Sequence, residues 1–346
     1  MGQLCDRRRG TGRVGMVEWG RIDGDTDEDG MTDPRPEVAR LHGELLRLAG
    51  HVPGDLLAQA RLRLADDDVD TVADLLDDLA GGRPEPSFGF APELSAEATV
   101  PVLDLTSEPL TDAADQAAAQ ALATLPEAVA LWRSWRVPAR WAAEAVPPVR
   151  VYVAEATTRP DLLPAVTALL MRALSGTGLT DPQVETYPAG MEPPPYQLRA
   201  RSAAALLWTA GATPPVRIAR VFDRGGAQGP RFDDDHERLT GDERDRVLGW
   251  LAGGSAIMAT TQRTTDVVEP ERGAVVPMNY RTDGRWVWTD TVSYYLRTHG
   301  LAPDAELLAD IRTDGSAVRT PTAVDEHRAL AALFRPQPAA PRRTAS

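Results

Sequence analysis

The sequence predicts an α+β fold, with an α/β core as the alternative arrangement of its central part. Three observations lead to this prediction. Apolar residues recur at helical spacing near the N-terminus, strand-like and helix-like segments alternate in the middle, and a hairpin-type turn sequence lies near the C-terminus. We therefore expect a helical N-terminal appendage, a central alternating strand/helix layer, and a C-terminal antiparallel hairpin accompanied by helices.

The first segment, residues 1–35, is Arg/Gly-rich and then acidic, without apolar periodicity. We expect it to be disordered, or to be an over-extended reading frame in which translation starts at Met31. The alternating carboxylates Asp25, Asp27 and Asp29 resemble the first half of an EF-hand calcium loop. The twelfth loop position is Pro36 instead of a bidentate Glu, so we predict no calcium site here.

Residues 36–82 are predicted to be a helical unit. Val38, Leu41, Leu45 and Leu48 recur at three- and four-residue spacing, and Gly50 ends the pattern. Two further stretches, near 56–64 and 69–79, repeat this spacing, which predicts a small helical hairpin or a three-helix unit. We interpret the leucine stripe as internal core, with a groove for a partner as the alternative, and we place His42 on the more polar side of its helix.

Residues 83–99 are predicted to be a linker, because prolines stand at 84, 86 and 92. Residues 100–240 are predicted to be an α/β domain in which strands and helices alternate. The expected strands are 100–105, 149–154, 184–187 and 216–222, and the expected helices are 110–131, 161–174 and 196–208.

Residues 241–334 are predicted to be an α+β module, followed by a disordered tail over 335–346. The strongest local signal is Asp283-Gly284, a positive-φ turn between the strand-like residues around Tyr280 and Trp286. The next helix is expected to begin at Thr289 or Asp290 and to end at Gly300. The other expected elements are strands at 256–261 and 274–280 and helices at 241–251, after Asp304, and at 323–334.

The run from Asp266-Val267-Val268 through Arg281–Asp290 to His299-Gly300-Leu301 resembles segments of an uncharacterised actinobacterial protein family with no assigned function. The resemblance covers about a tenth of the chain. It implies a folded module and no particular chemistry. The composition, in which Ala, Arg, Gly, Pro and Asp replace Lys and Asn, is typical of a high-GC genome.

Composition and charge exclude several classes of function. The formal charge of −14 argues against general binding to nucleic acids or anionic membranes, and no apolar run is long enough to span a bilayer. All 37 basic residues are Arg, so a Schiff-base, phosphate-loop or kinase-type lysine is impossible. Cys5 is the only cysteine, which excludes an intramolecular disulfide and a thiolate zinc cage. We expect a cytoplasmic protein.

The best candidate for a partner-binding surface is the aromatic and Arg-rich hairpin. Tyr280, Arg281, Arg285, Trp286 and Trp288 are of the residue types enriched in binding hot spots. Trp286 and Trp288 share one face of a strand, however, and the position of two tryptophans on a strand followed by a helix favours packing as core over a binding surface.

Two further clusters offer alternative chemistry. Asp233, Asp235 and His236 carry side chains that could bind a divalent metal. Further ligands would have to come from elsewhere, and the sequence places none of the candidates nearby; they are His51, His299, Asp104 and Asp223. The glycine-rich run 225–229 follows an expected strand, which is the position of a phosphate-binding loop in α/β units. Adjacent residues point in different directions, however, and the acidic cluster would repel phosphate.

These observations favour a non-catalytic cytoplasmic protein that binds another protein, of the adaptor, chaperone or toxin-neutralising type, with a basic partner. We predict no cofactor for this function. The first alternative is a metal-dependent hydrolase or transferase that uses the Asp233–His236 cluster and a divalent metal. The second alternative is a nucleotide-sensing regulator. The sequence does not indicate an oligomeric state.

Overall fold

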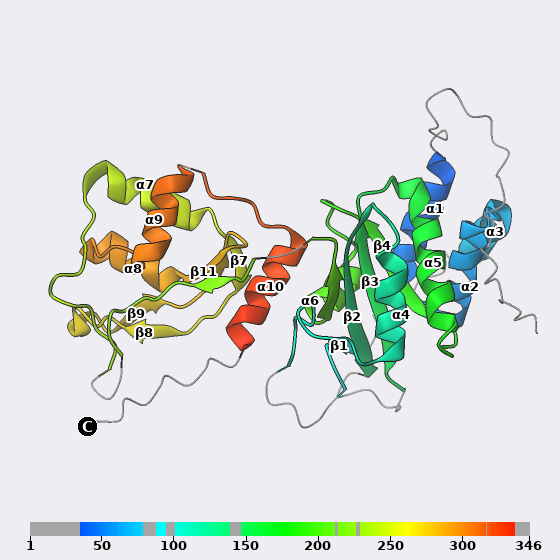
Figure 1. The fold of residues 1–346 in the computed structure, drawn as a ribbon, viewed down its shortest axis with the longest axis horizontal. Helices are drawn as coiled ribbons and strands as arrows, with labels where there is room; N and C mark the ends of the chain where they lie inside the picture. The colour runs from blue at the N-terminus through cyan, green and yellow to red at the C-terminus, as the bar shows by residue number, and fades with distance from the viewer. Residues whose placement is uncertain are drawn as a thin grey trace, which may run out of the picture. The chain divides into compact units, whose positions relative to one another are not determined.

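The computed structural model describes residues 35–78, 88–94, 101–138, 147–211, 214–225, 229–315 and 317–335. Helices and mixed sheets alternate along this part of the chain, which confirms the predicted α+β fold (Figure 1). Within it, no helix is long and apolar enough to cross a membrane. The predictions for residues 1–34, for most of the linker and for the tail after Arg335 concern positions outside the described residues.

The helices and strands have the following bounds. The helices are α1 (Pro36–Leu48), α2 (Gly54–Ala65), α3 (Val69–Asp78), α4 (Ala113–Leu122), α5 (Leu163–Ser175), α6 (Pro195–Ser202), α7 (Gly241–Ala252), α8 (Asp290–His299), α9 (Ala305–Asp314) and α10 (Ala323–Phe334), with 3-10 turns η1 (Pro160–Leu162) and η2 (Pro270–Arg272). The strands are β1 (Phe88–Ala91), β2 (Ala128–Pro138), β3 (Val149–Ala156), β4 (Gln183–Pro188), β5 (Ala205–Thr209), β6 (Arg217–Ile218), β7 (Ser255–Met258), β8 (Arg263–Thr265), β9 (Ala274–Pro277), β10 (Tyr280–Thr282) and β11 (Trp286–Thr289).

The first sheet is mixed and is covered by helices on both faces. Strand β2 pairs antiparallel with β3 on one side and with β5 and β1 on the other, whereas β3 and β4 are parallel and are joined through α5. Side chains alternate between the faces, so Val151 and Val153 pack toward α1 and α6, and Tyr152 and Ala154 pack toward α4 and α5. Figure 1 shows α4 and α5 in front of this sheet.

Two predicted helices were too long because strand pairing overrides the helix propensity of alanine and leucine. The helix expected over 110–131 ends at Leu122, and Ala128 begins the long strand β2 after Pro126. The helix expected over 196–208 ends at Ser202, and Ala205–Thr209 forms β5. In both cases the apolar run that follows the helix is the segment that pairs with a neighbouring strand.

Part of the predicted linker belongs to the same sheet. Residues Phe88–Ala91 form β1, which pairs with Trp135–Pro138 at the end of β2. The strand predicted over 100–105 is reduced to one parallel bridge between Asp104 and Leu206. Pro92 directly follows the edge strand β1 and does not interrupt its pairing.

The helical unit has three helices, which is one of the two predicted arrangements, but His42 lies differently from the prediction. The leucine stripe of α1 is core, since Leu41 and Leu45 are almost completely buried. His42 is only 3% exposed, and its Nε2 lies 2.9 Å from the carbonyl oxygen of Thr186 at the end of β4. A buried imidazole is tolerated at this position because that carbonyl satisfies one of its nitrogens.

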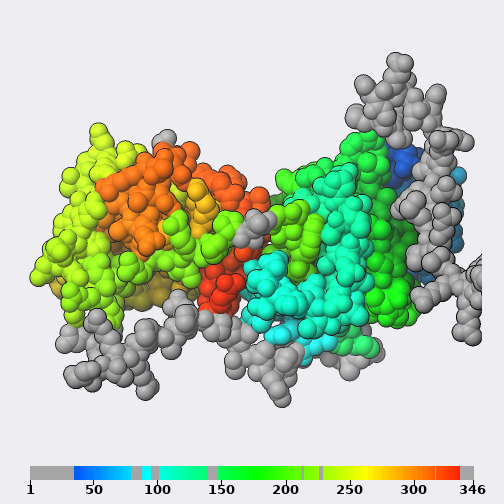
Figure 2. Space-filling view, in the orientation of Figure 1, coloured from blue at the N-terminus to red at the C-terminus, as the bar shows by residue number. Residues whose placement is uncertain are grey.

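The second sheet contains the predicted hairpin. Strands β10 and β11 pair antiparallel around Asp283-Gly284, where Gly284 has φ +91°, and β7 and β6 pair with their outer edges. Helix α8 begins at Asp290 and ends at Gly300, as predicted, and Asp304 caps α9 by accepting a hydrogen bond from the Glu306 amide. Strand β6 belongs to this sheet, although the sequence places it within the expected 100–240 domain. Helix α9 forms the orange surface in Figure 2.

Candidate functional site

The two tryptophans of the predicted partner-binding surface are core residues. Trp286 is 3% exposed and Trp288 is fully buried. The Trp288 indole N–H donates to the Leu251 carbonyl, and its ring lies 5.0 Å from that of Trp250 on α7. Trp286 and Trp288 are two residues apart on β11, so both rings lie on the same face of the strand. That face packs against helices α7 and α9. Neither ring is available to a partner in this structure.

The two arginines of the same surface bind acidic groups of the chain itself. Arg281 Nε donates to Asp290 Oδ1 at 2.7 Å, and Arg281 Nη1 donates to the Gly254 carbonyl at 3.0 Å. Arg285 forms an ion pair with Asp314. Of the five predicted contact residues, three are therefore accessible to a partner. They are the half-buried Tyr280 and the partly exposed Arg281 and Arg285.

A cavity of about 240 Å³ in the C-terminal module brings together the residues predicted as metal ligands. Asp233, Asp235 and His236 line it together with Asp223, one of the four further ligands considered from the sequence. The other three, His51, His299 and Asp104, do not line this cavity. Neighbouring residues of one loop converge here because that loop turns back on the segment after β6, where Arg224 and Arg231 form a backbone bridge.

His236 is held at both of its ring nitrogens. Nδ1 lies 2.8 Å from Asp223 Oδ2, and Nε2 lies 3.0 Å from the carbonyl oxygen of Ala302. Both neighbours are oxygen acceptors, so each ring nitrogen of His236 lies within hydrogen-bond distance of one acceptor. Partial burial raises the pKa of the Asp223 carboxyl, but hydrogen bonds from the Asp233 amide and His236 outweigh burial and leave its pKa below the usual value.

The remaining acidic side chains of this cavity are also partly engaged. Asp233 forms an ion pair with Arg224 at 2.6 Å, and Asp304 pairs with Arg220 at 3.0 Å. Asp235 is exposed. Within the described ranges, no three His, Cys, Asp or Glu side chains are arranged to hold a metal ion. The cluster therefore acts in this structure as a set of ion pairs that fixes the loop. Of the glycine-rich run 225–229, residues 226–228 lie outside the described ranges.

A second histidine–aspartate pair was missed by the sequence analysis. His299 Nε2 lies 2.7 Å from Asp266 Oδ2, which also accepts a hydrogen bond from the Tyr294 hydroxyl at 2.9 Å. Burial raises the pKa of Asp266, but these hydrogen bonds and those from the Val268 and Glu269 amides lower it overall. The pair ties the loop after β8 to α8. The only sequence signal was the position of His299 beside the C-terminal Gly300 of a helix.

The first module contains a buried polar cluster that the sequence analysis also missed. Arg61 Nη2 and Gln197 Nε2 both donate to Glu185 Oε2, at 2.5 Å and 2.7 Å, and the three side chains come from α2, α6 and β4. Arg61 is 2% exposed, and Glu185 and Gln197 are fully buried. Nothing in the residues around Arg61 indicates that this charged side chain is buried. Its partner Glu185 lies 124 residues further along the chain, so the local sequence carries no trace of the ion pair.

His42 should make folding of the chain sensitive to acid. Burial lowers its pKa from 6.5 to about 4, so the unfolded chain binds a proton between these values that the folded chain does not. Each pH unit corresponds to about 1.4 kcal/mol. We therefore expect the His42 contribution to the free energy of unfolding to fall by about 3 kcal/mol as the pH drops from 6.5 to 4.

The measurement is urea unfolding across this pH range for the wild-type chain and for His42→Gln, whose amide can donate to Thr186 but does not titrate. The wild-type curve should fall more steeply below pH 6.5. Parallel curves for the two proteins would contradict a neutral buried His42.

Comparisons of the chain with models of protein families, with curated proteins and with solved structures gave no match.

Proposed function

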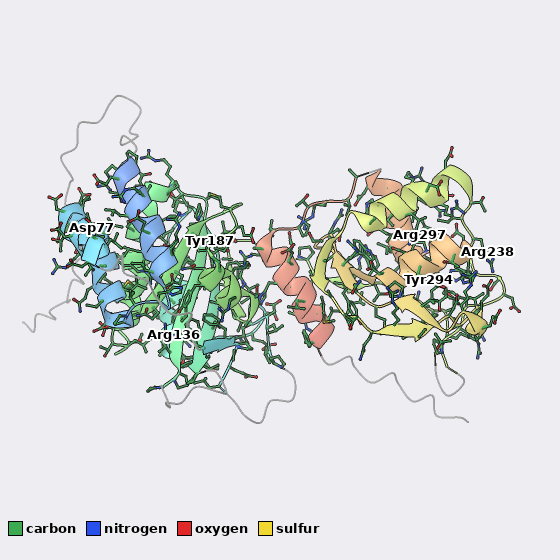
Figure 3. The ribbon with its side chains drawn as sticks, turned by 180° about the vertical axis from the view of Figure 1, so that it is seen from behind. Asp77, Arg136, Tyr187, Arg238, Tyr294 and Arg297 are labelled. Carbon is green, nitrogen blue, oxygen red and sulfur yellow. The ribbon has the colours of Figure 1, made fainter. Side chains whose placement is uncertain are left out.

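We propose that this chain is a non-catalytic cytoplasmic protein that binds a protein partner carrying a basic segment. The observation that carries the proposal is the charge arrangement of α3. Seven aspartates stand between positions 66 and 78, and Figure 3 shows Asp77 at the outer edge of the helical unit. They are Asp66, Asp67, Asp68, Asp70, Asp74, Asp77 and Asp78.

The C-terminal part of this arrangement opposes helix formation, whereas Asp70 in the first turn lies at the favourable positive end of the helix dipole. Asp70, Asp74 and Asp78 follow one another at i,i+4 spacing, where each like-charge contact costs about 0.2–0.5 kcal/mol. Asp77 and Asp78 also lie in the last turn of α3, next to the negative end of the helix dipole, and that turn contains no basic residue. A sequence that breaks local rules in this way is expected at functional positions.

Few cations of the described chain compensate these charges. Arg63 pairs with Asp68 at 3.0 Å and Arg172 pairs with Asp66 at 2.7 Å, whereas Asp70, Asp74, Asp77 and Asp78 form no ion pair with a described residue. All four side chains are exposed. A basic segment of a partner would relieve the repulsion and gain ion pairs, so the same feature that weakens α3 favours binding.

The proposal is tested with the full chain carrying an affinity tag, used to recover partners from the source lysate. Asp70→Asn/Asp74→Asn/Asp77→Asn should weaken the affinity for the recovered partner about tenfold, since three exposed ion pairs at about 0.2–1 kcal/mol each are lost. The affinity of the wild-type complex should also fall as salt concentration rises.

The matched control is Glu108→Gln/Asp234→Asn/Glu271→Gln, which changes the net charge equally at exposed residues outside α3. It should leave the affinity of the complex unchanged. Equal weakening by both variants would show that net charge and not the α3 surface determines binding. A wild-type chain that stays monomeric and recovers no specific partner would contradict the proposed function.

The alternative of a metal-dependent hydrolase or transferase would need His236 to leave Asp223 or the Ala302 carbonyl, so that one nitrogen lone pair could reach a metal. Titration of the chain with Mg²⁺, Mn²⁺ and Zn²⁺, followed by thermal unfolding, distinguishes the two functions. Stabilisation that is lost in Asp235→Ala would favour the enzyme.

A further inference from the structure

A cavity of about 440 Å³ lies in the first module at the carboxyl ends of the parallel strands β3 and β4. Its walls come from α1, from η1 and the start of α5 after β3, and from the loop after β4. Figure 3 shows Tyr187, at the end of β4, beside α1. The edge of a sheet beyond the carboxyl ends of parallel strands is the usual location of ligand sites in α/β layers, and this volume is in the range of small-molecule pockets.

The walls of this cavity are mostly apolar and are built from stiff backbone. The loop after β4 contributes Pro193, Pro194 and Pro195, whose rings are apolar and whose nitrogens carry no hydrogen-bond donor. Leu46 and Leu163 line the facing walls, and Met191 at the rim is 61% exposed. A ligand that buries apolar surface in a preformed pocket of this kind gains binding free energy, and the protein loses little conformational entropy.

The interior of the cavity offers no charge to a ligand. His42 lines it, and burial lowers the pKa of this imidazole to about 4, so the ring is neutral at pH 7. The Tyr187 hydroxyl is already bonded to Arg201 and lies 3.3 Å from Glu155. Arg47 and Glu192, of opposite charge, also line the cavity but are exposed. A charged ligand group in the buried part of the cavity, away from these two side chains, would have no partner, which is costly.

Gly43 is an independent indication that this space is kept open. Glycine in the interior of a helix costs about 0.8–1 kcal/mol relative to alanine. A Cβ atom at Gly43 would meet only Arg47 Nη1, at 4.0 Å, so no close packing contact requires a glycine here. Gly43 lines the cavity, and a side chain at this position would reduce its volume.

From these observations we propose that the cavity between α1 and the proline-rich loop after β4 binds an uncharged, mostly apolar small molecule. This ligand site goes beyond the proposed function, because it uses α1 and mostly apolar walls instead of the acidic residues of α3. The two proposals are tested with different variants, so either can fail without the other.

The test uses N-phenyl-1-naphthylamine, an uncharged fluorescent probe, titrated into the full chain. We expect saturable binding of one probe per chain, with increased fluorescence. The anionic analogue 8-anilinonaphthalene-1-sulfonate has a similar size and should bind about tenfold more weakly or less, which corresponds to about 1.4 kcal/mol. Absence of saturable binding, or equal affinity for the two probes, would overturn the proposal.

Two variants assign the binding to this cavity. Gly43→Leu fills the space and should weaken probe binding by about tenfold or more, while the helix keeps or gains stability because leucine is the better helix former. Ala39→Phe, one turn earlier on the same face, provides a second filling variant if Gly43→Leu fails to fold.

The matched control is Gly249→Leu in α7. Like Gly43, Gly249 lies inside a helix, and a Cβ atom at this exposed position would point into open space. Gly249 does not line the cavity. The control should bind the probe as the wild-type chain does. Wild-type affinity in folded Gly43→Leu and Ala39→Phe would show that the probe binds elsewhere and would refute the proposed site.

Discussion

Replacing Arg61 by alanine is expected to lower the free energy of unfolding by about 3–5 kcal/mol, because it leaves a carboxylate buried without its counterion. The side chains of Arg61 and Glu185 are 1% and 0% exposed, and their Nη2 and Oε2 atoms are 2.5 Å apart. In Arg61→Ala, the donor left to Glu185 among the observed contacts is the Gln197 amide, at 2.7 Å. A single neutral donor does not compensate the desolvation of a full charge.

The double variant Arg61→Met/Glu185→Leu distinguishes the cost of an unpaired buried charge from the net contribution of the ion pair to the free energy of unfolding. It removes both charges and keeps most of the volume, so the free energy of unfolding should return to within about 1–2 kcal/mol of the wild-type value. Gln197 keeps its second hydrogen bond, to the Leu46 carbonyl. Urea unfolding followed by circular dichroism measures all three proteins. A loss below about 1 kcal/mol in Arg61→Ala would mean that water reaches Glu185.

The type and order of most elements could be predicted from the sequence, because local signals determine them. The leucine spacing of α1, the Asp283-Gly284 turn and the Gly300 helix end are each encoded within a few residues, and the structure contains all three. Strand β2 could not be predicted in this way. Ala128–Leu131 has helix-forming composition, and it becomes a strand only because β3 and β5, distant in sequence, pair with its edges.

The candidate site was less predictable for the same reason. The sequence grouped Asp233, Asp235 and His236 only because they are close together in the chain, and the structure places all three around one cavity. The sequence could not show that the Ala302 carbonyl, 66 residues away, lies within hydrogen-bond distance of His236 Nε2. The cavity lined by His42 is formed by three segments that are far apart in the sequence. No local pattern therefore indicates that their apolar residues come together.

Trp288→Ala should be the most damaging single substitution in the C-terminal module. The indole is fully buried among the residues of α7 and β11, and removing such a side chain from a core costs about 3–5 kcal/mol. The variant also leaves the Leu251 carbonyl without the indole N–H. Thermal unfolding should show this loss in the absence of any partner. An unchanged melting temperature would contradict a core role and restore Trp288 as a candidate contact residue.

Gly254 offers a test of the same packing from the opposite side. A Cβ atom at this glycine would lie 2.3 Å from Cζ2 of Trp288 and 2.5 Å from Cη2, so Gly254→Ala should cost about 1–3 kcal/mol through overpacking. Once Trp288 is alanine, that clash is gone and the same substitution should cost much less, although the Thr282 carbonyl at 3.2 Å remains close. A double-mutant cycle measures this coupling. Strictly additive losses would show that the Thr282 carbonyl, and not the Trp288 ring, determines the cost of the added methyl group.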